Sequence, residues 1–159
     1  MKDGLAYDHD TLKSLSQLLE RKVKDLDRAI RFNFSVIAPR VVEHAKRNDV
    51  GNYKDRTGNL RSSIGYILVK NGRTIQSNFE AVHGGSESGE KGVKEATSYA
   101  HELAKKAGEG YTLIIVAGMN YARHVEGLKG YNVLTKSGFY MEKEINIMIE
   151  RVLKKAGFK

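Results

Sequence analysis

Ten apolar residues, spaced like one face of a helix, constrain this chain more than any other feature of its sequence. The steps between them are three or four residues, which matches the 3.6-residue period of an α-helix. The spacing therefore predicts one long amphipathic helix, with Asp10 or Thr11 as its N-cap. Pro39 removes one backbone donor near its end, which predicts a kink or a junction of two helices there. The ten residues are Leu12, Leu15, Leu19, Val23, Leu26, Ile30, Phe34, Ile37, Val41 and Ala45.

A helix of this length is longer than a domain built from a chain of this size is wide. At 1.5 Å per residue it spans on the order of 45–50 Å. Part of it should overhang the core, and an overhang that carries apolar residues indicates a neighbouring subunit. A kink at Pro39 that folds the helix back on itself is the alternative.

The middle of the chain has the pattern of strands. Residues 63–69 (SIGYILV) predict one strand, Asn71 and Gly72 predict a two-residue hairpin turn, and residues 73–79 predict the returning strand. Gly65, inside the first strand, indicates a bulge or a close backbone approach. Residues 111–116 (YTLIIV) form an uncharged, β-branched run, which is typical of a central strand covered on both faces.

The remaining segments predict helices and one loop. Residues 83–92 (HGGSESGEKG) lack apolar side chains and predict a mobile surface loop, and residues 93–107 predict a short helix. Ser137 is the expected cap of a final helix that ends at Gly157. We therefore expect one domain over residues 1–159. Its fold class is α+β: a small, mostly antiparallel sheet flanked by a long N-terminal helix and a C-terminal helix.

The net charge of +8 is spread along the 159 residues. Nucleic-acid-binding proteins more often concentrate basic residues on one face, with aromatic side chains between them. A basic nucleic-acid-binding module stays an alternative, with Tyr53, Tyr66 and Tyr111 as its stacking groups. The chain has no cysteine, and no apolar run approaches the ~20 residues that cross a bilayer. We expect a soluble protein that is not exported.

Few residues suggest catalysis. His124 and Glu126 would share one face of a strand, but no third ligand stands near them, so we expect no metal, no cofactor and no catalytic residue. Glu126 is expected to accept hydrogen bonds from backbone amides or to pair with Arg61 or Arg123. A small α+β hydrolase or nuclease stays a second alternative, which requires carboxylates that converge near His124.

Two short motifs in a fixed order resemble a known family. A TGNLRxSI segment precedes the hairpin, and a YAxxVE segment follows the apolar strand. This order resembles the small tail-completion, or head–tail joining, proteins of long-tailed bacteriophages and prophages. The matching residues are Thr57, Gly58, Asn59, Leu60, Arg61, Ser63 and Ile64, and then Tyr121, Ala122, Val125 and Glu126.

The resemblance implies a structural protein that acts by ring assembly and not by catalysis. Its site would be the structural motif of Thr57, Gly58, Leu60, Arg61, Ile64, Tyr121, Ala122 and Glu126. Its partners would be further copies of itself, the head–tail connector and the tail-tube proteins, with DNA passing through without sequence recognition. It would lie in the neck or tail of the virion, or in the bacterial cytoplasm during assembly. A minor tail component is a variant of the same role. We also expect the two motifs to lie against each other.

Overall fold

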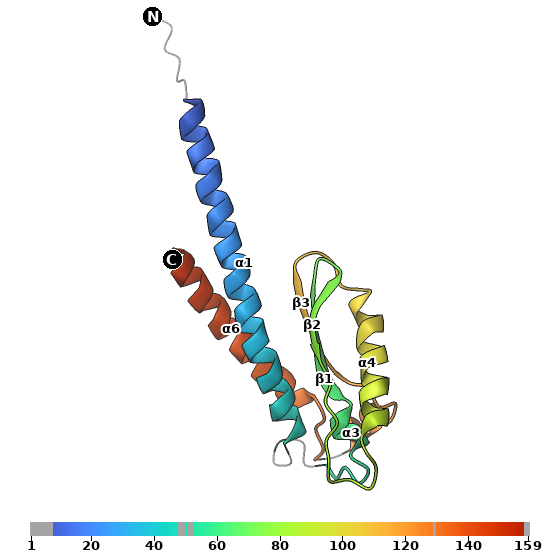
Figure 1. The fold of residues 1–159 in the computed structure, drawn as a ribbon. Coiled ribbons are helices and arrows are strands. Elements are labelled where there is room, and N and C mark those ends of the chain that lie inside the picture. Colours follow the sequence, from blue (N-terminus) through green and yellow to red (C-terminus); the bar gives the residue numbers. More distant parts are fainter. Residues whose placement is uncertain (1–7, 48–49, 51–52, 129, 158–159) are drawn as a thin grey trace, which may run out of the picture.

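The computed structural model describes residues 8–47, 50, 53–128 and 130–157, and it has the expected α+β architecture (Figure 1). A three-stranded antiparallel sheet lies between one helix on one face and the two longest helices on the other. In chain order the elements are α1 (His9–Lys46), α3 (Asn59–Ser62), β1 (Ile64–Lys70), β2 (Arg73–Asn78), α4 (Glu90–Ala104), β3 (Tyr111–Ala117), α5 (Ala122–Gly127) and α6 (Thr135–Ala156).

The strand order is β2-β1-β3, so β1 occupies the centre of the sheet. β1 pairs with β3 from Ile64 opposite Ala117 to Lys70 opposite Tyr111. The prediction that residues 111–116 form the central strand was wrong, because β3 is an edge strand. Most of its side chains are only half-buried, whereas β1 is buried along nearly its whole length. One long edge of β3 therefore has no strand beside it in the described part of the chain.

Alternate side chains of β1 enter two separate layers of the core. On one face, Ile67 and Val69 pack against α4, whose inward side chains are alanines. Small side chains allow the helix to approach the sheet closely. On the other face, Leu68 packs against α1 and α6, between residues such as Val41 and Met148. This two-sided burial is what makes β1 the centre of the fold.

α1 is a single helix of 38 residues that continues through Pro39. The predicted junction of two helices at Pro39 was therefore wrong. The predicted cap was also wrong, because Asp8 precedes the helix and no side chain caps it. The C-terminal half of α1 packs on the sheet and on α6, and its N-terminal half projects beyond both (Figure 1).

The hairpin follows its sequence pattern. Asn71 and Gly72 both have positive φ, as a tight two-residue turn requires. Gly65 is a site of close approach, since a Cβ atom there would lie 2.1 Å from the ring of Phe79. The register irregularity of the β1–β2 pair lies elsewhere, between Leu68 and Val69.

Two expectations about the helices need correction. Ser137 does not cap α6, which begins at Thr135; Ser137 is buried and its hydroxyl lies 2.9 Å from Nδ1 of His44. The ring of His44 also stacks on Tyr140 at 4.6 Å between centroids. His44 therefore helps to join α1 to α6. The helix expected at residues 93–107 is α4, which begins and ends three residues earlier.

Candidate interaction site

The two sequence motifs lie against each other at one end of the sheet, as expected. Leu60 and Ile64 of the first motif belong to the same hydrophobic cluster as Ala122 of the second. The amide of Gly118 donates to the carbonyl of Ser63 over 3.0 Å, which links the segments leading into and out of the sheet. The motifs thus form one packed joint rather than two separate surfaces.

Asp55, which the sequence reading did not single out, shapes the turn of the first motif. Its carboxylate accepts hydrogen bonds from the amides of Gly58 at 3.0 Å and Arg61 at 2.7 Å, and from that of Leu60 at 3.4 Å. It therefore satisfies the free amides at the start of α3, as an N-cap does. Thr57 contributes a weaker bond, from the amide of Asn59 at 3.2 Å.

Gly58 is required by this turn. Its φ of +84° lies in the left-handed region, which side chains rarely adopt. A Cβ atom at this position would also lie 3.0 Å from the carbonyl oxygen of Val82. Substitution of Gly58 would thus disturb both the turn and the segment packed against it.

Arg61 lies over the ring of Tyr53, with its guanidinium carbon 5.4 Å from the ring centroid. It also donates to the carbonyl of Tyr53 over 3.5 Å. Tyr53 is only 5% exposed, and burial raises its pKa to about 12. Its hydroxyl donates to the carbonyl of Ala45 over 3.4 Å. Arg61 and Tyr53 together hold the first motif against the end of α1.

Glu126 caps the start of α6 from the neighbouring helix. Its carboxylate accepts hydrogen bonds from the amides of Val133, Leu134 and Thr135 and from the hydroxyl of Thr135. Burial alone would raise the pKa of Glu126, but these hydrogen bonds outweigh it and the pKa is lowered. Of the expected roles, acceptance from backbone amides is confirmed.

The relation expected between His124 and Glu126 was wrong. Both lie on α5, a helix, and not on a strand. Two residues apart on a helix, they point to sides about 200° apart. Since the carboxylate of Glu126 is engaged by backbone amides, this pair offers no acid–base arrangement.

Tyr121 and Ala122 begin the second motif with different exposure. Ala122 is buried, whereas Tyr121 remains 37% exposed. Burial raises the pKa of Tyr121, and a hydrogen bond with Thr57 partly opposes this. Tyr121 therefore joins the two motifs while it presents part of its ring at the surface.

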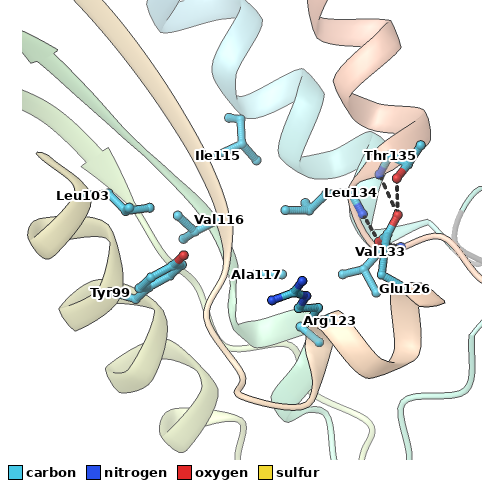
Figure 2. A pocket seen from close by; sticks show the side chains of 11 residues that line it. Tyr99, Leu103, Ile115, Val116, Ala117, Arg123, Glu126, Val133, Leu134 and Thr135 are labelled. Atoms are coloured by element: carbon cyan, nitrogen blue, oxygen red, sulfur yellow. Dashed lines mark hydrogen bonds between the residues drawn. The ribbon is translucent and has the colours of Figure 1, made fainter. Parts of the chain in front are cut away.

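An open cleft of about 420 Å³ lies beside the second motif, along the edge of β3 (Figure 2). Tyr99 and Leu103 of α4 form one wall, and Leu134, at the start of α6, forms the opposite one. Arg123 points into the space between them. Such a cleft suits an apolar segment with an acceptor for the guanidinium. Among the described residues, no three His, Asp or Glu side chains converge to hold a metal ion.

The segment expected to be a mobile loop lies against the first motif. The amide of Ser86 donates to the carbonyl of Arg56 over 2.9 Å, and the side chain of Asn59 donates to Glu87 over 2.6 Å. Residues 90–92 belong to α4. The mobility of residues 83–89 stays a prediction, while these bonds give the segment a defined path around α3.

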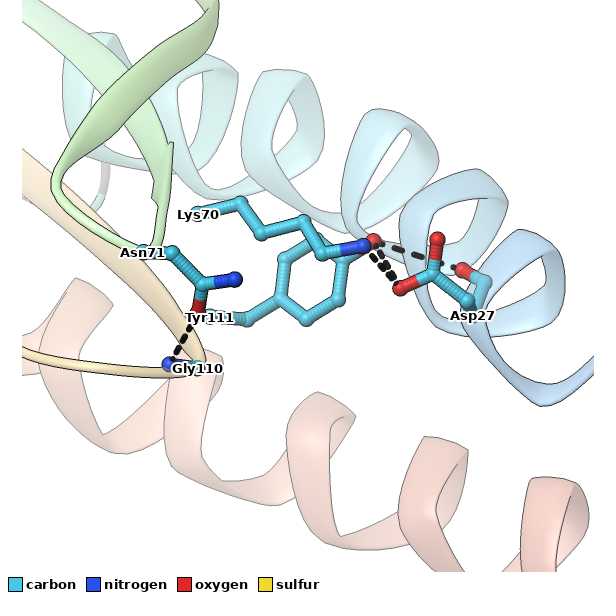
Figure 3. Close-up of polar contacts among 5 residues, drawn as sticks. All are labelled: Asp27, Lys70, Asn71, Gly110 and Tyr111. Carbon is cyan, nitrogen blue, oxygen red and sulfur yellow. Dashed lines mark hydrogen bonds and ion pairs between the residues drawn. The ribbon is translucent and has the colours of Figure 1, made fainter. Parts of the chain in front are cut away.

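The opposite end of the sheet is fastened to α1 by polar contacts (Figure 3). Asp27 accepts a hydrogen bond from the hydroxyl of Tyr111 at 2.9 Å and forms an ion pair with Lys70. The amide of Gly110 donates to the side chain of Asn71 over 2.8 Å. The hydrogen bond from Lys70 is the main cause that lowers the pKa of Asp27. These contacts mark where α1 leaves the body of the protein.

On the N-terminal side of Leu26 the apolar stripe of α1 is uncovered. Leu12, Leu15 and Leu19 are 50–56% exposed, and Val23 is 65% exposed. We call these four residues, with the helical segment from His9 to Asp25 that carries them, the overhang. Contiguous exposed apolar side chains of this kind mark interaction surfaces in soluble proteins. The overhang is the clearest such surface in the described part of the chain.

The tyrosines that would serve a nucleic-acid-binding module do not have the required exposure. Tyr53 and Tyr66 are buried, and Tyr111 packs against Phe34 with its ring centroid 5.8 Å away. Burial leaves Tyr53 and Tyr66 no ring face to offer a base, and the half-buried ring of Tyr111 is already packed against Phe34. The aromatic part of the argument for that alternative is weakened, and the net charge remains.

Within the described residues, no helix combines the length and hydropathy that crossing a membrane requires. Comparison with protein-family models, with curated proteins and with solved structures gives no match to this chain.

Proposed function

We propose that this chain is a structural protein of the head–tail junction or tail of a long-tailed bacteriophage or prophage. It acts by assembly into a ring and not by catalysis. Its partners are further copies of itself, the head–tail connector and the tail-tube proteins. It works in the neck or tail of the virion and is present in the bacterial cytoplasm during assembly.

The overhang is the observation that carries this proposal. A protein that exposes a row of leucines on a projecting helix has a surface that another protein can cover. The tail-completion resemblance supplies the kind of assembly, a closed ring, in which each subunit offers such a surface to a neighbour. Without the overhang, the resemblance would rest on two short motifs.

The role of the motifs also supports a structural protein. Arg61 and Glu126 satisfy backbone groups and join separate segments of the chain. Ala122 and Leu60 fill the core at the same place. The motif residues thus have structural roles in this chain. Structural roles are what the resemblance to tail-completion proteins implies for them.

Cryo-microscopy of particles from the phage or prophage that encodes this chain tests the proposal. We expect neck or tail density that fits the sheet, α1 and α6, with the overhang covered by a neighbouring subunit. Particles from a deletion of the gene are the matched control, and they should lack that density. Neck and tail density fully explained by other proteins would overturn the proposal.

Duplex-binding measurements separate the proposal from the nucleic-acid alternative. If DNA only passes through a ring, the free protein should bind duplex weakly, and the binding should fall steeply as salt rises. Submicromolar binding that resists salt would instead favour a dedicated nucleic-acid-binding module.

A further inference from the structure

We infer that the overhang of one copy pairs in antiparallel orientation with the overhang of a second copy, and that the free protein forms a two-fold dimer. This inference goes beyond the proposed function, because it concerns the free chain and does not require a phage particle. Three observations carry it: the repeat of the stripe, the point at which its covering stops, and the charges beside it.

The stripe has an 11-residue repeat. Its ten residues, from Leu12 to Ala45, are separated by steps of 3, 4 and 4 residues, repeated three times. This corresponds to about 3.67 residues per turn, close to the 3.6 of a straight helix. The exposed part of the stripe is therefore on the same side of α1 as the part that packs on the sheet and α6.

The covering of that side stops near Leu26. Leu26 and Ile30 pack against the core cluster, while Val23 and the leucines before it are exposed. A second helix can thus lie along residues 12–23 on the same side, in line with the body of the protein. Residues 12–23 make about three turns of helix.

The direction of that second helix follows from the space available. In parallel orientation, the second copy's helix would continue past its own Leu26 into the region that the sheet and α6 of the first copy occupy. In antiparallel orientation it continues the other way, beyond His9 of the first copy. The two bodies then lie at opposite ends of the paired segment, and neither obstructs the other.

Charge complementarity fixes the register. In an antiparallel pair centred between residues 17 and 18, Leu12 lies opposite Val23 of the second copy. Lys13 and Glu20 lie one residue after Leu12 and Leu19, on the same flank of the stripe. Flanking positions of this kind face each other across antiparallel helices. Lys13 of each copy therefore faces Glu20 of the other, twice in the dimer.

The other charges beside the stripe are compatible with this register. Lys24 shares the flank of Glu20 but lies about 40° farther round α1, so Glu20 is the nearer of the two to Lys13. On the other flank, Lys22 of one copy faces Leu15 of the other, and its aliphatic stem can cover that leucine. All these side chains are exposed in the single chain. A second copy of this chain is thus an occupant that matches the surface in both shape and charge.

Sedimentation velocity over a wide range of concentration tests the dimer. The parent protein should pass from monomer to dimer. Lys13→Glu should weaken the dimer by about tenfold or more, because two attractive contacts become repulsive. Glu20→Lys should do the same. An equimolar mixture of the two variants should regain the parent's dimerisation, since opposite charges then face each other at both contacts. Arg21→Glu, on the opposite side of α1, is the matched control and should have no effect.

Cysteine cross-linking tests the orientation directly, because the parent chain contains no cysteine. A mixture of Leu12→Cys and Val23→Cys copies should form a disulfide-linked dimer under mild oxidation, faster than either variant alone. Rapid self-linkage of Leu12→Cys would indicate a parallel pair and overturn the inference. A monomer at every concentration, or no recovery when the charge variants are mixed, would also overturn it.

These outcomes are distinguishable from a failure of the proposed function. Free protein can dimerise whether or not the chain belongs to a virion. A two-fold pair uses the same surface on both copies, whereas a ring uses two different surfaces. If both proposals hold, the dimer must open when the ring forms, because both assemblies cover the overhang.

Discussion

The two halves of α1 have the same apolar stripe and opposite surroundings. From Phe34 to Ala45 its stripe residues are at most 8% exposed, whereas from Leu12 to Val23 they are at least 50% exposed. Both sets of four residues are apolar, and the steps between them are the same. Periodicity therefore shows which side of a helix is apolar, but what covers that side depends on where the rest of the chain ends. Here the sheet and α6 reach only to about Leu26.

The largest expected effect comes from truncating a stripe residue in the covered half. Ile37→Ala should lower the free energy of unfolding by about 2–5 kcal/mol, because it leaves a cavity among well-packed neighbours. Leu15→Ala in the overhang is the matched variant, and in dilute protein it should change that free energy by no more than about 0.5 kcal/mol. Chemical denaturation of both variants measures the difference. Equal losses of unfolding free energy in the two variants would contradict the difference in burial between the two halves of α1.

Glu126, in the joint between the two motifs, should make the stability of the folded protein depend on pH. Its folded-state pKa is lowered from 4.5, so its carboxylate stabilises the folded protein above that pH, and the contribution is lost as the pH falls through the folded pKa. Glu126→Gln should cost about 1–3 kcal/mol at neutral pH, with less loss on acidification than the parent shows. Exposed Glu142→Gln is the control. Chemical denaturation at several pH values measures the free energy of unfolding of the parent and both variants. If Glu126→Gln loses as much stability on acidification as the parent and Glu142→Gln do, the prediction is wrong.

The hydroxyl of Tyr121 should have a smaller effect. Tyr121→Phe removes the hydrogen bond with Thr57 and keeps the ring, so we expect a loss of about 0.5–1.5 kcal/mol in thermal or chemical unfolding. Because the ring is 37% exposed, Tyr121→Ala should cost less than truncation of a fully buried aromatic residue. If Tyr121→Ala lowered the free energy of unfolding as much as Ile37→Ala, the ring of Tyr121 would be more completely buried than its exposed fraction indicates.

The smallest effect is expected at the boundary between the halves. Asp27→Asn removes the ion pair with Lys70 and should cost at most about 1 kcal/mol, since surface pairs are weakened by solvent and salt. Asp25→Asn, which affects only the pair with Arg28 on the same helix, is the control. The Asp27 effect should shrink as salt is added. A salt-independent loss would mean that the hydrogen bond from Tyr111, rather than the ion pair, fastens this end of the sheet.

The sequence predicted most of the helical framework and the hairpin. The ten apolar positions of the stripe in α1 fit the helical period and do not fit the two-residue period of a strand. Asn71 and Gly72 are residues that favour the tight turn they form. The strand order was not predictable in the same way. β1 and β3 both read as apolar, β-branched runs, and nothing local shows which of them lies between the other two strands.

The joint between the motifs was predicted in part. Its location followed from both motifs flanking the same sheet, and amide acceptance by Glu126 was among the options. Asp55 was missed, although Asp is a preferred N-cap and stands three residues before Gly58. The six-residue α5 was too short for its period to show, so His124 and Glu126 were placed on one face of a strand. Local patterns identified the polar groups, and tertiary contacts chose their partners.

The continuity of α1 through Pro39 has a mechanical consequence. With no break along its 38 residues, α1 behaves as a stiff rod whose base is clamped between the sheet and α6. Residues 9–25 form a lever arm of about 26 Å at 1.5 Å per residue. A small tilt of the clamped part therefore becomes a much larger sideways displacement at Leu12. The packing around Ile37 and Val41 thus sets the direction in which the overhang projects, although these residues do not contact its leucines.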